Sequence, residues 1–159
     1  MEIRSATAGD FDAMWAIFKA AIAAGDALPF GRTFEAETFR SHWFGLQTAD
    51  VAVLEDRVVG MYKMGANFPD LGAHVASATY VVDPRVQGRG IGRELVEHSL
   101  VRARSEGFLA MQFNYVVSTN TPAVAPYRTL GFAVVGTLPE AFRHRELGLI
   151  DVYVMHRFL

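Results

Sequence analysis

The sequence contains no cysteine. Disulfide bonds, thiolate metal sites and thiol nucleophiles are therefore all excluded. The histidines show no metal-ligand spacing with one another or with carboxylates, so we expect no bound metal.

An excess of basic residues is also missing. The chain has 15 basic and 17 acidic side chains and a net charge of −2, which argues against a protein that binds nucleic-acid phosphates. No apolar run reaches the roughly 20 residues of a membrane-spanning helix, and the first residues lack the apolar core of a secretory signal. We expect a cytoplasmic protein with no nucleic-acid or membrane partner.

The composition is that of a globular domain. Of the 159 residues, 51% are hydrophobic and 20% are charged, and a chain of this length forms one core, so we expect a single domain over residues 1–159. Helical periodicity covers residues 8–24, preceded by a capping box of Thr7 and Asp10, and a second helix is expected from a Thr33 cap to about Leu46. A hairpin turning at residues 55–57, strands over 74–83 and 109–117, a short helix and two final strands complete the pattern.

Three glycines, two residues apart, stand where the strand over 74–83 gives way to an amphipathic helix that we expect to end at Gly107. These glycines, Gly88, Gly90 and Gly92, remove side chains where a ligand must approach the backbone closely. Arginines 85, 89 and 93 are interleaved with them. Unpaired amides and the helix dipole favour an anion at such a junction, so the sequence predicts a phosphate-bearing ligand.

Two common phosphate-binding loops do not fit this stretch. The dinucleotide pattern would need a third glycine where Arg93 stands, and an acidic residue about 20 positions onward, near Gln112. A P-loop needs a lysine, which the stretch lacks. A tight turn without ligand is the remaining alternative, but such a turn needs one glycine and not three.

The segment resembles the GNAT superfamily of N-acetyltransferases. Its signature of Gln or Arg, two residues, Gly, one residue, then Gly or Ala is matched at residues 87–92. A second match lies at residues 120–132, where Asn120, Tyr127 and Phe132 fall on the family's late motif, with Pro126 where the family commonly has leucine. The order of elements along nearly the whole chain is also the family's order.

The resemblance implies an α/β (α+β) fold with a mixed, mostly antiparallel sheet of about seven strands and about four flanking helices. It implies acetyl-CoA as cosubstrate, with the pyrophosphate on backbone amides of the glycine stretch and the pantetheine arm paired like an added strand. Arg85, Arg89 or Arg93 would lie near the nucleotide phosphates, with a solvated role as the alternative for Arg85 and Arg93. The implied cofactor-binding residues are Val81, Val82, Gln87, Gly88, Arg89, Gly90, Ile91, Gly92, Arg93, Asn120 and Tyr127.

The absence of cysteine also rules out an acetyl-cysteine intermediate, so an acceptor amine would attack the thioester directly. A backbone amide near Val82 would stabilise the oxyanion. The resemblance makes Tyr127 the catalytic residue that interacts with the leaving thiolate. A thiol pKa of about 8.5 against about 10 for tyrosine makes a hydrogen bond from Tyr127 the first role to expect, and a packing tyrosine is the alternative. We assign no general base.

The acceptor is predicted to be a small amino acid or an analogue of one. In the loop over residues 25–34, Phe30 is an apolar contact and Arg32 a bidentate partner for a carboxylate, with a solvated Arg32 as the alternative. Ser77 and Asn114 would hydrogen-bond the acceptor, or have structural roles. Residues 111–120 and 136–144 resemble the branch of phosphinothricin-type and fungal azetidine-2-carboxylate acetyltransferases, although the fungal enzymes have asparagine where Ser77 stands.

Two other functions are compatible with the same motifs. One is acetylation of a protein or peptide amine, and the other is a non-catalytic CoA-binding regulatory module. The last predicted strand also has apolar side chains on both faces, so it is either interior to the sheet or covered by a partner chain, and we expect a homodimer.

Overall fold

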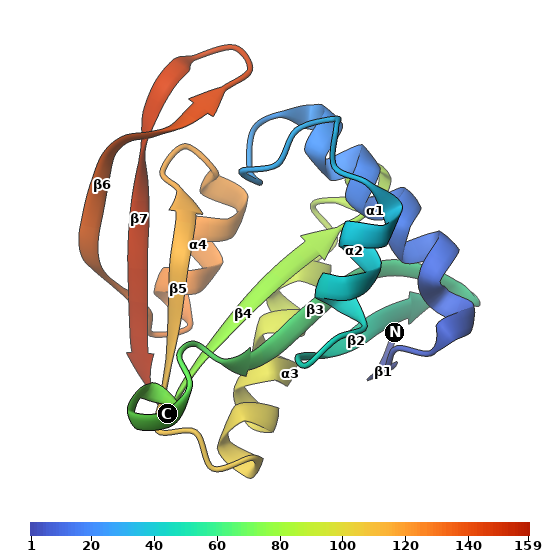
Figure 1. Cartoon of the computed structure of the whole chain (residues 1–159), viewed down its shortest axis with the longest axis horizontal. Helices are drawn as coiled ribbons and strands as arrows, with labels where there is room; N and C mark the ends of the chain where they lie inside the picture. Colours follow the sequence, from blue (N-terminus) through green and yellow to red (C-terminus); the bar gives the residue numbers. More distant parts are fainter.

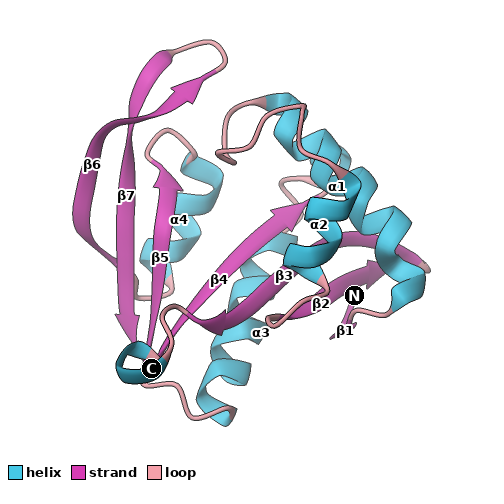
Figure 2. Cartoon of the chain, viewed as in Figure 1, coloured by secondary structure: helices cyan, strands magenta, loops and turns pink.

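A seven-stranded sheet, in the order β1-β2-β3-β4-β5-β7-β6, organises the protein. The computed structural model describes residues 1–159 (Figures 1 and 2). The α-helices are α1 (Phe11–Ala24), α2 (Ala36–Trp43), α3 (Ile91–Ser105) and α4 (Thr121–Thr129). The strands are β1 (Glu2–Ser5), β2 (Thr48–Leu54), β3 (Arg57–Ala66), β4 (Val75–Val82), β5 (Ala110–Val117), β6 (Ala133–His144) and β7 (Gly148–Phe158). The predicted α/β fold, with seven strands and four helices, is confirmed.

Two helix starts differ from the prediction. Residues Ala8–Asp10 form a 3-10 turn before α1, because the Asp10 carboxylate turns back to accept a hydrogen bond from the Thr7 amide at 2.8 Å. The second helix begins at Ala36 and ends at Trp43, without Thr33 as its cap. A bond from the Phe34 amide to the Gly31 carbonyl closes a separate turn there, so the helix starts only after it.

Strands β4 and β5 are the only parallel neighbours, and they pair for a very short distance. Their register contains Val75 with Ala110 and Ala76 with Met111, and no pair beyond these. Figure 1 shows the two strands close together at their starts and far apart at their arrowheads. The sheet is therefore split into two halves that separate toward the carboxyl ends of β4 and β5.

Each face of the split sheet has its own core. Helices α3 and α4 pack on one face, where α3 contacts β3 and β4 and its Leu95 belongs to the same core cluster as Met111 of β5. Helices α1 and α2 cover the other face over β2 to β4, around Phe18, Phe39 and Val81. A smaller cluster of Val117, Phe142 and Val152 joins β5, β6 and β7. On the face covered by α1, the end of β4 at Val81 and the end of β5 at Val117 thus belong to separate clusters.

The apolar final strand is interior to the sheet. β7 pairs antiparallel with β5 on one side and with β6 on the other, which by itself explains apolar side chains on both of its faces. The homodimer stays a prediction, and light scattering at micromolar concentration measures it.

One ion pair fixes the start of α1 against β1. The Arg4 guanidinium donates two hydrogen bonds to the Asp10 carboxylate, at 2.8 and 2.9 Å. Asp10 is buried, and its bonds with Arg4 and Thr7 lower its pKa to about 2 from an ordinary 3.8. The stability that this pair contributes is present above the unfolded pKa and is lost as the pH falls.

We predict that Asp10→Asn lowers the free energy of unfolding by about 1–2 kcal/mol at pH 6. The difference from wild type should narrow as the pH falls from about 4 toward 2, because the wild-type carboxylate then becomes protonated. Urea unfolding at several pH values measures this. Asp26→Asn is the control, since Asp26 is exposed and makes no ion pair. A pH-independent difference would contradict the prediction.

Candidate active site

The glycine stretch forms a turn that only glycine adopts without strain. Gly88 and Gly90 both have φ of 80°, and a Cβ atom on either would meet no atom within 4 Å. The backbone between β4 and α3 is therefore bare and faces open space. Gly92 lies in the first turn of α3, where its added Cβ would be 3.6 Å from Val82.

The amides of this turn have no partner within the chain. None of the N–H groups of residues 87–93 donates to a backbone carbonyl, and the first hydrogen bond of α3 runs from Glu94 to the Gly90 carbonyl at 3.1 Å. No side chain accepts from these amides either. A row of free donors at the positive end of a helix is suited to an oxygen-rich anion.

The three arginines around the turn differ in their partners. Arg85 is held by the buried carboxylate of Asp83 at 2.8 Å, and Arg93 donates to Glu97 at 2.9 Å and to Thr129 at 3.4 Å. Arg89 is exposed and makes no ion pair or side-chain hydrogen bond. Of the three, Arg89 is therefore the cation whose charge is not already compensated.

The edge of β4 that faces β5 is unpaired over its second half. Bonds from the Asn67 amide to the Val75 carbonyl and from the Asp83 amide to the Val59 carbonyl mark the odd-numbered residues of β4 as those bonded to β3. Tyr80 and Val82 consequently direct their N–H and C=O groups toward the gap left by β5. Val81 bonds to β3, and its side chain is buried under α1.

Tyr127 lies on α4 inside an aromatic cluster. Its ring centroid is 4.6 Å from that of Phe113, 6.0 Å from Phe132 and 6.2 Å from Tyr80. Burial raises the pKa of Tyr127 above its ordinary value, so the phenol stays protonated over the physiological range. The hydroxyl makes no hydrogen bond within the chain and is not sealed from solvent, which leaves it free to donate to a ligand.

Two further residues of the late motif are the N-cap residue of α4, Asn120, and Pro126 inside the helix. Pro126 does not break the helix, which continues to Thr129. Asn120 occupies the N-cap position, where its carbonyl accepts from the Val124 amide at 3.0 Å but its side chain makes no capping bond. The amide group of Asn120 is thus free of protein partners.

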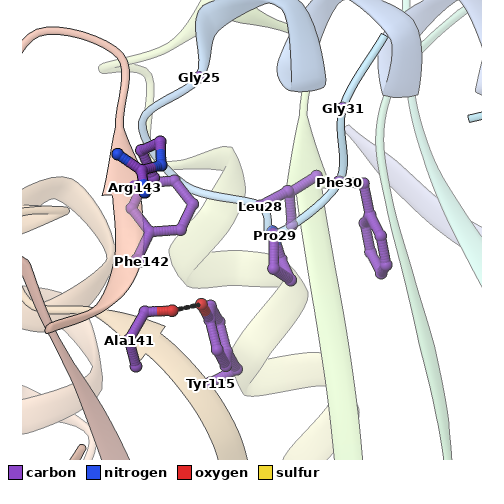
Figure 3. Close-up of a pocket in the computed structure, with 9 residues that line it drawn as sticks. All are labelled: Gly25, Leu28, Pro29, Phe30, Gly31, Tyr115, Ala141, Phe142 and Arg143. Carbon is purple, nitrogen blue, oxygen red and sulfur yellow. Dashed lines mark hydrogen bonds between the residues drawn. The ribbon is translucent and has the colours of Figure 1, made fainter. Parts of the chain in front are cut away.

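A cleft of about 310 Å³ lies on the opposite face, between the loop after α1 and the β6–β7 hairpin (Figure 3). Leu28 on the loop side packs against the cluster that contains Val81, and Phe142 on the hairpin side packs with Val117. The Tyr115 hydroxyl donates to the Ala141 carbonyl at 2.6 Å, as the dashed line in Figure 3 shows. The residues lining the cleft are Gly25, Leu28, Pro29, Phe30, Gly31, Tyr115, Ala141, Phe142 and Arg143.

Only one of the four predicted acceptor residues, Phe30, lines this cleft. Arg32 is exposed on the loop without a partner. Ser77 lies on the α1 side of β4 outside the lining. The Asn114 amide is already engaged, donating to Asn67 at 2.6 Å and accepting from Gln112 at 2.9 Å.

The hairpin side of the cleft was missed by the sequence reasoning. Phe142 and Arg143 follow an irregularity in the β6–β7 register between Leu138 and Phe142, and this irregularity brings them beside the loop after α1. Pro139 within the predicted strand was the available signal, since proline inside a strand indicates an edge or a bulge.

Comparison with known proteins places this site in a family. A sequence model of the acetyltransferase (GNAT) family matches residues 13–132. The chain belongs to this family. A GCN5-related N-acetyltransferase from Kribbella flavida is 40% identical, with a TM-score of 0.95 over 99% of this chain and 97% of that one. Membership confirms the family predicted from the two motifs.

More distant relatives add less about this particular GNAT protein. A phosphinothricin acetyltransferase from Sinorhizobium meliloti, solved in complex with AcCoA, is 22% identical with a TM-score of 0.88, over 99% of this chain and 88% of that one, and shares the fold. The N-acetyltransferase aca1 of Schizosaccharomyces pombe is 29% identical over 98 residues, which are 61% of this chain and 47% of that protein. The chain spans less than half the length of aca1 and of the other curated relatives that it matches first.

Two kinds of feature are absent from the structure. None of the helices has both the length and the apolar character to cross a membrane. No group of three or more histidine, aspartate or glutamate side chains is arranged to hold a metal ion.

We predict that Gly90→Ala weakens binding of acetyl-CoA about tenfold or more, because the methyl group and the strained φ disturb the free amides. Gly107→Ala is a matched control at the other end of α3: its φ is 86° and an added Cβ also meets no atom within 4 Å. Both variants should lose about 1–2 kcal/mol of stability. Calorimetric titration measures the affinity of each variant for acetyl-CoA. If Gly90→Ala binds acetyl-CoA as tightly as Gly107→Ala, the assignment of this turn to the cofactor is refuted.

Proposed function

We propose that this GNAT protein transfers the acetyl group of acetyl-CoA directly to the amine of a small molecule, an amino acid or an analogue of one. The observation that carries the proposal is the unpaired edge of β4 opposite the splayed β5. This edge lies between the turn of free amides after β4 and the helix that carries Tyr127 after β5. The acceptor cleft opens where the same two strands are farthest apart.

The residues around the edge fit each part of acetyl-CoA. The amides of residues 87–92 match the pyrophosphate oxygens, and Arg89, whose charge is not compensated by a carboxylate, supplies positive charge. The amide-bearing pantetheine arm fits beside β4 as an added strand, with Tyr80 and Val82 as the backbone partners. The free side-chain amide of Asn120 adds a polar contact on the β5 side.

The transfer forms a C–N bond between the acceptor amine and the acetyl carbon and breaks the C–S bond of the thioester. A backbone amide near Val82 donates to the carbonyl oxygen as negative charge develops on it. The amine loses one proton, and the sulfur gains one to leave as the free thiol. Since its pKa is raised, Tyr127 acts as a hydrogen-bond donor to the departing sulfur more readily than as a full acid.

No carboxylate or histidine lines the acceptor cleft, so no protein group there is placed to take the proton of the amine. The amine therefore reacts as its neutral form, with its proton passing to solvent. The cleft volume of about 310 Å³ is at the small end of the range for ligand sites, which favours a small molecule over a peptide segment.

We predict that acetyl-CoA at 100 times its Kd raises the free energy of unfolding by about 2.7 kcal/mol, which thermal unfolding records as a higher Tm. NAD and ATP at the same concentration should have no comparable effect, because the turn lacks the residues of their binding loops. Stabilisation by NAD or ATP alone would overturn the cofactor assignment.

We predict that Tyr127→Phe lowers kcat at least tenfold and leaves the affinity for acetyl-CoA nearly unchanged, because it removes only the hydroxyl that faces the sulfur. Steady-state kinetics with a panel of free amines, together with calorimetric titration, measures both quantities. Tyr153→Phe is the matched control, since Tyr153 is also half-buried and its hydroxyl also lacks a partner, but it lies on β7 and not on α4. Unchanged turnover in Tyr127→Phe would remove Tyr127 from the mechanism. An inactive protein that still binds acetyl-CoA would support the alternative of a regulatory module.

A further inference from the structure

The charge of the acceptor cleft comes from one residue. Arg143 is the only charged side chain in the lining, and every other lining residue is apolar, a glycine, or Tyr115. Arg143 is exposed and makes no hydrogen bond or ion pair within the chain. The cleft therefore presents one uncompensated positive charge and no negative charge to whatever enters it (Figure 3).

Arg145, in the same hairpin, has a structural role. The Arg145 amide donates to the Gly25 carbonyl at 3.0 Å, and its guanidinium donates to the Ala23 carbonyl at 3.2 Å. These bonds fasten the β6–β7 hairpin to the end of α1. A Cβ on Gly25 would come within 2.9 Å of the Arg145 Cβ, so the contact is close.

This fastening fixes the two walls of the cleft relative to each other. On one wall, Leu28, Pro29 and Phe30 form an apolar surface, and Phe30 is itself held by Phe18 and Phe34 at centroid distances of 6.0 and 4.9 Å. Arg143 extends from the other wall. An anionic group and an apolar group of one ligand can thus be bound at the same time in a preorganised site.

We propose that Arg143 binds the carboxylate of the acceptor while the surface of Leu28, Pro29 and Phe30 packs against an apolar side chain. The acceptor is then an α-amino carboxylate with a branched or aromatic side chain. This inference rests on the proposed function and replaces Arg32, which lies outside the lining, as the carboxylate partner. A guanidinium pairs with a carboxylate bidentately, and a single one suits a singly charged group.

The test measures binding, so it does not depend on turnover. The protein is saturated with CoA and titrated with L-phenylalanine, L-leucine, glycine, L-phenylalaninamide and phenethylamine in a calorimeter. Wild type should bind phenylalanine and leucine at least tenfold more tightly than phenylalaninamide, phenethylamine or glycine. Arg143→Gln should weaken phenylalanine binding at least tenfold and change phenylalaninamide binding less than twofold, and Arg143→Lys should restore part of the loss.

Arg104→Gln is the matched control, because Arg104 is an exposed, unpaired arginine on α3, away from the cleft. Thermal unfolding of each variant checks the fold. Equal binding of phenylalanine and its amide by wild type, or binding of none of the ligands, would overturn the proposal. So would a result in which Arg32→Gln abolishes the carboxylate preference and Arg143→Gln keeps it. Glycine binding as tight as phenylalanine binding would contradict the proposed packing of Leu28, Pro29 and Phe30 against an apolar side chain.

Acetyl transfer to the same compounds separates this inference from the proposed function. If the protein acetylates amines but its binding shows no preference for a carboxylate, the role of Arg143 is contradicted and the proposed enzyme activity is not. Carboxylate-selective binding without any acetyl-CoA consumption would contradict the proposed enzyme activity and leave the ligand assignment supported.

Discussion

The divergence of β4 from β5 is the constraint on which the rest of this structure depends. Buried backbone amides and carbonyls need partners, and a strand in the middle of a sheet normally finds them on both sides. Here β4 is bonded to β3 along its whole length but to β5 only at its start. The carboxyl half of β4 is thus an edge in the interior of the molecule, and a ligand rich in amides can complete it.

The same divergence explains where the chemical groups lie. Each of the two separating strands is followed by a helix, α3 after β4 and α4 after β5, so both helix N-termini are at the splayed end. The positive ends of two helix dipoles and the free amides of the glycine turn are consequently gathered there, and Tyr127, near the end of α4, packs beside Tyr80 and Phe113. On the opposite face no helix covers β5 and β7, and the loop after α1 and the β6–β7 hairpin border a cleft instead.

Features that depend on short stretches of chain could be predicted from the sequence. The Thr7–Asp10 contact, the hairpin turn at Glu55 and Asp56 and the end of α3 at Gly107 are confirmed, because each is specified by residues a few positions apart. The glycine motif and the late motif at residues 120–132 were together sufficient to predict the family and hence the fold. The roles given to the individual cofactor and acceptor residues stay predictions.

Features that depend on contacts between distant segments could not be predicted from the sequence. The loss of pairing between β4 and β5 leaves no mark in either strand. Asn114 was placed on the correct strand, and one of its partners, Gln112, is two residues away, but the other, Asn67, lies after β3, where no local pattern indicates the contact. Arg143 reaches the cleft through an irregular strand pairing, whereas Arg32, in the expected loop, is outside it.

The contact between Arg145 and the end of α1 joins segments separated by 122 residues. Closing a loop of that length is entropically costly, and the pairing of β6 and β7 beside β5 brings the two segments together. The two walls of the cleft thus come from opposite ends of the chain, whereas the glycine turn is built from neighbouring residues. Changes in the final hairpin would alter the cleft while the glycine turn and the unpaired edge of β4 keep their structure, so these two regions can diverge independently in evolution.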